Sequence, residues 1–134
     1  MKSKLELRQA MEVKRIAFLK AEKEYQKAVE EYTRKAFSIK VTQIQVMTAT
    51  AFGISIDRML SGTHKRNIVD SRQMSMLLSR ENTDMSLASI GDLHGGKDHA
   101  TVIHACKTVK SLIDTNSNFR ILYNKLSEEI KMLP

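Results

Sequence analysis

The sequence predicts an all-α fold, and three observations carry that prediction. Its 134 residues contain one proline and five glycines, so few positions favour turns. Aromatic residues make up only 5% of the chain, and the aromatic and β-branched runs typical of strands are scarce. Apolar residues instead recur at spacings of three and four, which is the period of an amphipathic helix. A chain of this length accommodates one domain with an appendage.

Residues 1–37 are predicted to form one long amphipathic helix, because they contain neither glycine nor proline and alternate densely in lysine and glutamate. Apolar residues recur once per heptad, at Met11, Phe18, Tyr25 and Tyr32. Three roles stay open for this helix. It could be a coiled-coil arm that forms a homodimer or binds a protein partner, a helix packed on the rest of the chain, or a solvated connector.

Residues 38–134 are predicted to form a second domain of helices, each an apolar stripe bounded by cap or turn residues. Gly53 ends the first of these helices, whereas Ser86 and Asp98 are suited to cap later ones. The polar run 114–118 is predicted to be a loop. The expected helices span residues 38–52, 56–60, 68–80, 86–93, 98–113 and 119–132.

The stretch Gly95–Val102 indicates a helix-turn-helix. Two glycines stop the helix that ends near Leu93, and Asp98 then begins a new amphipathic run. Its first turn is polar and mixed in character, which is where such a motif places the side chains that contact base edges.

Charge favours a polyanionic partner. The net charge is +7, which suits nucleic acid or an anionic membrane surface. No apolar run is long enough to span a membrane, and no signal-peptide pattern opens the chain. The single Cys106 excludes an internal disulfide and is expected in a reducing cytoplasm.

Two other kinds of site fit the residues poorly. Gly91–Lys97 satisfies the spacing of a phosphate-binding loop, but Asp98 stands where that loop needs serine or threonine. His94, His99 and His104 are five residues apart, a spacing that does not align two histidines on one helical face. We therefore expect no metal, no cofactor and no catalytic residue.

Residues 38 to about 133 resemble the C-terminal DNA-binding domain of the bacterial replication initiator DnaA. The resemblance rests on Ser71–Met76, on Ser86–Asp92 and above all on Gly95–Cys106. The last block is close to the family signature Gly-Gly-Arg/Lys-Asp-His-Thr/Ala-Thr-Val. The resemblance implies a helix-turn-helix domain of the DnaA domain IV or Trp-repressor-like type, preceded here by the long N-terminal helix.

The resemblance also implies a DNA site. In the family, a recognition helix enters the major groove, a basic loop enters the neighbouring minor groove, and further residues touch the phosphate backbone. The matching positions are His64, Lys65 and Arg66 in the basic loop, Arg72, Gln73 and Leu87 at the backbone, and Lys97, Asp98, His99, Ala100 and Thr101 at the start of the recognition helix.

Elementary chemistry supports these roles. The Asp98 carboxylate can accept from a cytosine amino group, and the Ala100 methyl can contact a thymine methyl. His99 can donate or accept, depending on its tautomer. Thr101 and the free N–H groups of a helix start suit a phosphate oxygen.

The sequence therefore predicts a non-enzymatic protein that binds double-stranded DNA at sites like the DnaA box, in replication initiation or its regulation. Residues 1–37 are too few for the AAA+ module that precedes this domain in DnaA, so recognition without ATP-driven melting is expected. The alternative is a protein-interaction adaptor that works through the long helix and retains the DnaA-like domain as a scaffold.

Overall fold

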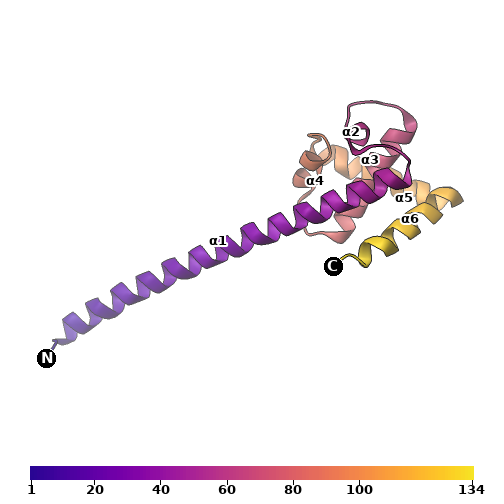
Figure 1. Cartoon of the computed structure of the whole chain (residues 1–134). Coiled ribbons are helices and arrows are strands. Elements are labelled where there is room, and N and C mark those ends of the chain that lie inside the picture. Colours follow the sequence, from indigo (N-terminus) through magenta and orange to yellow (C-terminus); the bar gives the residue numbers. More distant parts are fainter. The chain divides into compact units, whose positions relative to one another are not determined.

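The structure is a computed structural model that describes every residue, Met1–Pro134. It contains only helices, which confirms the predicted all-α class (Figure 1). No helix combines the length and hydropathy that a membrane crossing needs. The elements are α1 (Lys4–Ala51), α2 (Ile56–Met59), α3 (Arg66–Asn82), α4 (Leu87–Leu93), α5 (His99–Thr115) and α6 (Ser117–Lys131).

The chain forms two compact units, residues 1–35 and 36–134, and α1 contributes to both. The sequence predicted two helices, over residues 1–37 and 38–52, and this was wrong, because the single helix α1 spans both. Nothing in that stretch breaks a helix, since it contains no glycine or proline. The Thr42 hydroxyl also donates to the Ser38 carbonyl at 3.1 Å within the helix. The division into domains 1–37 and 38–134 stays a prediction.

The first unit is the N-terminal part of α1. It begins with a capping box, in which the Glu6 N–H donates to Ser3 Oγ and the Ser3 N–H donates to Glu6 Oε2, both at 3.2 Å. Apart from the half-buried Ala10, every residue of this unit is exposed. The helix therefore presents its charged and its apolar side chains alike to solvent.

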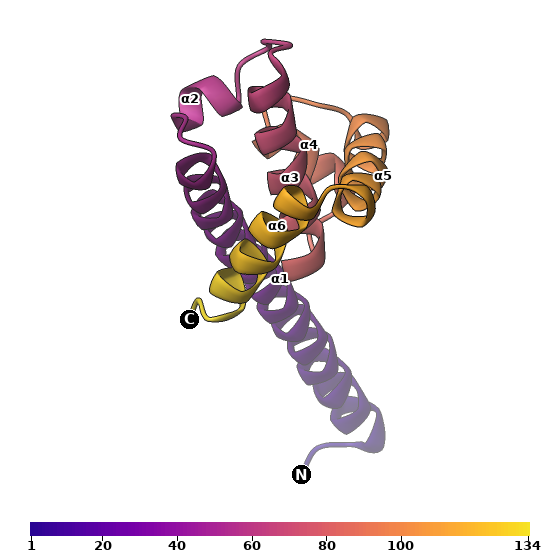
Figure 2. The ribbon, with the colours of Figure 1, turned by 90° about the vertical axis from the view of Figure 1, so that its right-hand side faces the viewer.

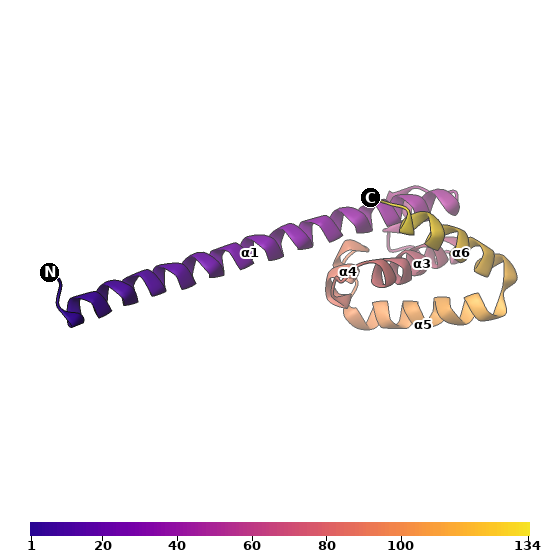
Figure 3. The ribbon, with the colours of Figure 1, turned by 90° about the horizontal axis from the view of Figure 1, so that it is seen from below.

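The second unit is built around α3. Figures 2 and 3 show α3 between α5 on one side and, on the other, α6 together with the C-terminal part of α1. The sequence predicted one apolar side for α3, but its buried residues lie on nearly all sides. Ser71, Ser75 and Ser79 are small and buried at successive turns, which lets neighbouring elements approach the helix closely.

Two apolar clusters hold this unit together, and α3 contributes to both. One cluster joins α3 to α4 and α5 through Met76, Leu77, Ile90, Val102, Ala105, Cys106 and Val109. The other joins α3 to α1 and α6 through Ile44, Met74, Leu78, Leu126 and Ile130. The pair α4–α5 is thus anchored along one side of the central helix.

The structure confirms two predicted helix caps, but it contradicts one predicted loop. Ser86 caps α4 by accepting from the Ser89 N–H, and Asp98 caps α5 by accepting from the Thr101 N–H, as predicted. The predicted loop 114–118 was wrong. Asn116 alone separates α5 from α6, ending the first helix and capping the second through the Phe119 N–H.

Candidate DNA-binding site

The turn between α4 and α5 depends on backbone shapes that favour glycine. Gly95 and Gly96 have φ angles of +85° and +73°, in the left-handed region. A Cβ on Gly95 would also lie 2.6 Å from the Leu60 carbonyl oxygen. The turn therefore packs directly on the end of α2, and the two glycines make both the bend and the contact possible.

Gly91 sets how closely α4 meets the start of α5. A Cβ at this position would lie 2.0 Å from the Lys97 carbonyl oxygen and 3.3 Å from that of Asp98. The Lys97 N–H donates to the Gly91 carbonyl at 2.9 Å. Only a glycine lets the segment before α5 fold back onto α4, so Gly91 fixes the approach of the two helices.

The start of α5 and the two residues before it present a short run of side chains to solvent. Asp98, His99, Ala100 and Thr101 are exposed and Lys97 is half-buried, and we call these five residues the recognition tip. Asp98 Oδ1 accepts from the Thr101 N–H at 2.8 Å. This hydrogen bond is the main cause that lowers the pKa of Asp98, with the Thr101 side chain adding to it. The tip is thus an ionised cap followed by three side chains open to solvent.

A fully buried histidine supports the turn from below. His94 Nδ1 donates to the Ile90 carbonyl at 2.8 Å, because a carbonyl can only accept. Its Nε2 then accepts from the Ser75 hydroxyl of α3 at 2.7 Å. Burial lowers the pKa of His94 to about 4, against the opposing hydrogen bond to Ile90. His94 therefore stays neutral and connects the turn to the central helix.

A second buried polar contact joins α1 to the same turn. Gln45 is 5% exposed, and its side-chain amide donates to the Leu93 carbonyl at 2.7 Å. This bond satisfies one of the last carbonyls of α4, which no N–H of the helix itself can reach. Neither Gln45 nor His94 was given a role from the sequence. Gln45 follows Ile44 on the buried face of α1, which is the one signal that pointed to it.

The basic loop lies between α2 and α3. His64 and Lys65 precede α3, whereas Arg66 is its first residue, and all three are exposed. Arg66 Nε lies 3.5 Å from Asp70 Oδ1, four residues along the helix. Burial raises the pKa of Asp70, and the pairing with Arg66 opposes that rise. The loop thus offers cationic side chains to solvent, with one of them paired at the surface.

Arg72 lies beneath this loop. It is only 7% exposed, and its Nη1 donates to the Met59 carbonyl at 3.1 Å and to the Ser61 carbonyl at 2.7 Å. The guanidinium therefore ties the end of α2 and the start of the loop to α3. A contact between Arg72 and a DNA phosphate stays a prediction, and the hydrogen bonds give this side chain a structural task that the sequence did not signal.

The loop and the turn share one stretch of backbone. The Met59 and Ser61 carbonyls bind Arg72, and the Leu60 carbonyl between them faces Gly95. The structure thus brings the base of the basic loop against the turn that precedes α5. The remaining predicted residues are half-buried, Gln73 on α3 and Leu87 at the start of α4, where Leu87 packs against the first apolar cluster.

A comparison with protein families agrees with this geometry. Residues 41–109 match the family described as bacterial dnaA protein helix-turn-helix, and the match covers just over half of the chain. It runs from the buried part of α1 to the middle of α5 and so includes the basic loop, the turn and the recognition tip. The chain therefore belongs to the bacterial DnaA helix-turn-helix family, a family of DNA-binding rather than catalytic domains.

Proposed function

We propose that this chain binds double-stranded DNA in a sequence-specific way, at sites that resemble the DnaA box, and serves replication initiation or its regulation. One observation carries the proposal. Four consecutive exposed residues, Asp98 to Thr101, form the cap and the first turn of a 17-residue helix. The start of this helix is fixed by the Asp98 cap, by the close contacts of Gly91 and Gly95, and by the buried His94 of the preceding turn. A fixed helix start with open polar side chains suits entry into the major groove.

Three residues of the recognition tip would contact base edges. Asp98 is ionised, and its Oδ1 accepts the capping hydrogen bond from the Thr101 N–H. Its Oδ2 can therefore accept from a cytosine amino group. The exposed His99 ring can donate to or accept from a base edge. The Ala100 methyl can pack on the methyl group of thymine. These three contacts would distinguish DNA sequences, because each favours a different base.

Other residues would hold the phosphate backbone. Lys97 and Thr101 flank the reading residues, and the first N–H groups of α5 point out of the helix start, where they favour an anion. Gln73 of α3 and Leu87 of α4 are half-buried, so part of each side chain stays open to a phosphate. Such contacts set the register of the protein on the duplex without reading sequence.

The basic loop would enter the adjacent minor groove. His64, Lys65 and Arg66 are exposed, and a narrow minor groove concentrates negative potential that attracts such side chains. The ion pair between Arg66 and Asp70 is no obstacle, since the Arg66 side chain is 82% exposed and surface pairs of this kind contribute at most about 1 kcal/mol. Arg72 would then act from below, by holding the loop in place.

Titration of the full chain against two labelled duplexes tests the proposal by fluorescence anisotropy. One duplex carries a DnaA box, and the other has the same base composition in scrambled order. We expect the box to bind at least about tenfold more tightly, since one good base contact contributes about 1–3 kcal/mol. Equal binding to both duplexes, or binding to neither, would refute sequence-specific recognition.

A further inference from the structure

A row of uncovered apolar side chains follows the N-terminal unit at a regular interval. Met11, Phe18, Tyr25 and Tyr32 are spaced by seven residues and remain 70%, 67%, 71% and 76% exposed. Solvent exposure of three aromatic rings on one line of one helix is costly, because each can bury roughly 150–250 Å² in a contact. Such a line marks a surface that another helix would cover.

A second line completes a heptad seam. The second line consists of Leu7, Lys14, Ala21 and Ala28. Each of its residues comes four positions before a residue of the first line, and the last three also come three positions after one, so both lines share one helical face. The first line holds large side chains, and the middle of the second holds alanines. Apart from Met1, the other large exposed apolar residues of this unit are Leu5, Val13, Ile16, Leu19 and Val29. None of them lies between Leu19 and Val29, so they form no seam of this length.

We propose that residues 7–32 of two copies of this chain form an antiparallel two-helix coiled coil. In one register, every large seam residue of one copy faces either a smaller residue of the other copy or the flexible side chain of Lys14. It pairs Leu7 with Tyr32, Met11 with Ala28, Lys14 with Tyr25 and Phe18 with Ala21, each pair occurring twice by symmetry.

Side-chain size favours this register. An alanine opposite Phe18 or Met11 leaves room for the larger group, whereas aligned large residues would hold the helices apart. The aliphatic stem of Lys14 can lie on the Tyr25 ring while its ammonium reaches water or the ring face. A parallel dimer in register would instead place Lys14 against Lys14 and stack equal residues in every layer.

Charge favours the same register. In an antiparallel coil with these layers, Arg15 of one copy flanks the seam beside Glu22 of the other, and the symmetry creates this pair twice. Within its own helix, Arg15 Nε lies 3.4 Å from Glu12 Oε2, with both side chains more than half exposed. The guanidinium therefore already lies along the edge of the seam with donors to spare.

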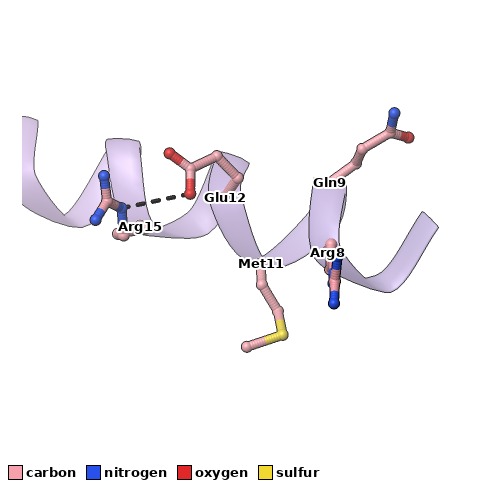
Figure 4. Close-up of a pocket in the computed structure, with 5 residues that line it drawn as sticks. All are labelled: Arg8, Gln9, Met11, Glu12 and Arg15. Atoms are coloured by element: carbon pink, nitrogen blue, oxygen red, sulfur yellow. Dashed lines mark ion pairs between the residues drawn. The ribbon is translucent and has the colours of Figure 1, made fainter. Parts of the chain in front are cut away.

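A shallow surface depression beside Met11 borders the seam on the side of Arg8 and Arg15. It is lined by Arg8, Gln9, Met11, Glu12 and Arg15. Figure 4 shows Met11 between Arg8 and the Glu12–Arg15 ion pair. Gln9 points to the other side of the helix from Met11, so of these five residues Met11 belongs to the seam and the two arginines to its edge.

The area is sufficient for a dimer. The three aromatic residues of each seam can together bury roughly 500 Å². Leu7, Met11 and Val29 would bring the total toward the ~800 Å² per partner that stable complexes bury. Residues 7–32 also span nearly four heptads, which is within the three to four heptads that a coiled coil needs.

Sedimentation equilibrium of the full chain tests the dimer. We expect a dimer at micromolar concentration, and a Phe18→Glu variant whose dimer dissociation constant rises at least about tenfold. Ile16→Glu is the matched control, since Ile16 is also well exposed, at 56% against 67% for Phe18, but lies off the seam. A monomeric wild type, or equal effects of both variants, would overturn the proposal. Circular dichroism checks that each variant keeps its helix content.

Charge reversal tests the register. Arg15→Glu alone places a second carboxylate near Glu22 of the other copy and should weaken the dimer, whereas Glu22→Arg alone brings two guanidinium groups together and should weaken it as well. The combined variant restores opposite charges across the interface and should recover most of the affinity. In one helix these residues are seven apart and do not touch, so additive losses in the combined variant would contradict this register.

Disulfide trapping tests the orientation. Mixed Met11→Cys and Ala28→Cys chains should form a cross-linked heterodimer under mild oxidation, because the two positions face each other in the antiparallel register. Met11→Cys alone should not cross-link to itself. Efficient self-linking of that variant would show a parallel dimer and overturn the proposal; the native Cys106 is buried and does not compete.

Discussion

Two histidines five residues apart have opposite environments in this protein. His94 is fully buried, neutral and held by Ser75 and Ile90, whereas His99 is exposed on the recognition tip. The first has donors and acceptors matched by the fold, and the second has its ring nitrogens open to solvent. Chemistry alone does not separate them, because the difference lies in what surrounds each ring.

The buried histidine should make stability depend on pH. The pKa of His94 is lowered from 6.5 to about 4, so the unfolded chain binds a proton first as the pH falls. The free energy of unfolding should therefore drop between pH 6.5 and about 4, by about 2–3 kcal/mol in all. Urea unfolding at a series of pH values measures the drop.

A His94→Gln variant should show a flatter profile over that range, even if it is less stable at pH 7. His104→Gln is the control, because His104 is exposed and its loss should leave the wild-type slope in place. Equal slopes in wild type and His94→Gln would contradict a buried, neutral His94.

The recognition tip and the basic loop should respond differently to truncation. His99→Ala should cost about 1–3 kcal/mol on the preferred duplex and relax specificity, because a base contact is lost. Lys65→Ala should weaken all sequences alike, because a phosphate or groove charge is lost. Anisotropy titrations on the box and scrambled duplexes compare them, with Lys131→Ala as the control for loss of one exposed positive charge. Identical behaviour of His99→Ala and Lys65→Ala would refute the division into reading and anchoring residues.

At the scale of elements, the pair α4–α5 is held by backbone contacts that leave no room for a side chain. Gly91→Ala would bring a Cβ against the Lys97 carbonyl, which is backbone and cannot rotate away. We expect a loss of about 1–3 kcal/mol in stability and weaker DNA binding, since α5 must shift. Gly62→Ala is the control, because nothing lies within 4 Å of its Cβ. Thermal unfolding measures the stability of both variants. A Gly91→Ala protein as stable as Gly62→Ala would contradict this packing.

The loop between α2 and α3 should depend on Arg72. Arg72→Met removes the donor to the Met59 and Ser61 carbonyls, and each unsatisfied buried carbonyl costs about 1–3 kcal/mol. Arg80→Met, on the exposed end of the same helix, is the control. Amide hydrogen exchange should show faster exchange at residues 60–66 in Arg72→Met only. Unchanged exchange there would argue that Arg72 does not hold the loop.

Local signals predicted most of the elements. The caps at Ser86 and Asp98 and the glycines at 95 and 96 each act within one turn of the chain, and the apolar stripe of α5 repeats within one helix. Each of these features was predicted correctly. Residues 114–118 were wrongly predicted to be a loop, because polar residues of this kind are typical of loops. One of them, Asn116, is enough to end one helix and begin the next.

Long-range features could not be predicted in the same way. His94 and Ser75 are 19 residues apart in the sequence, and Gln45 and Leu93 are 48 apart, so no local pattern predicts either hydrogen bond. The resemblance assigned Arg72 a contact with the DNA backbone, but the side chain is only 7% exposed, and two backbone carbonyls compensate its burial. The DNA contacts themselves were implied by family resemblance, and the structure adds the positions of the residues.

For the whole molecule, charge is spread over both units. Residues 1–35 contain ten lysines and arginines against six acidic residues, and residues 36–134 contain twelve against nine. The proposed interface itself holds three exposed or half-buried cations, Lys65, Arg66 and Lys97. Overall charge would therefore draw the protein to DNA, whereas the interface would define the contacts.

Salt dependence measures how many charges touch the duplex. Three phosphate contacts predict that log K falls with log salt with a slope of about −3. Lys65→Ala should reduce that slope by about one. A much steeper slope would mean that the cations of residues 1–35 also bind phosphate, and a slope near zero would exclude an electrostatic interface.

Sequence reading by the start of α5 is best tested by selection from a random duplex pool. Duplexes retained by the full chain would be sequenced, in parallel with those retained by His99→Ala. We predict that the wild type enriches one DnaA-box-like motif and that His99→Ala loses preference at one position of it while keeping the rest. No enriched motif for the wild type, or the same motif at full strength for His99→Ala, would contradict base reading by this helix.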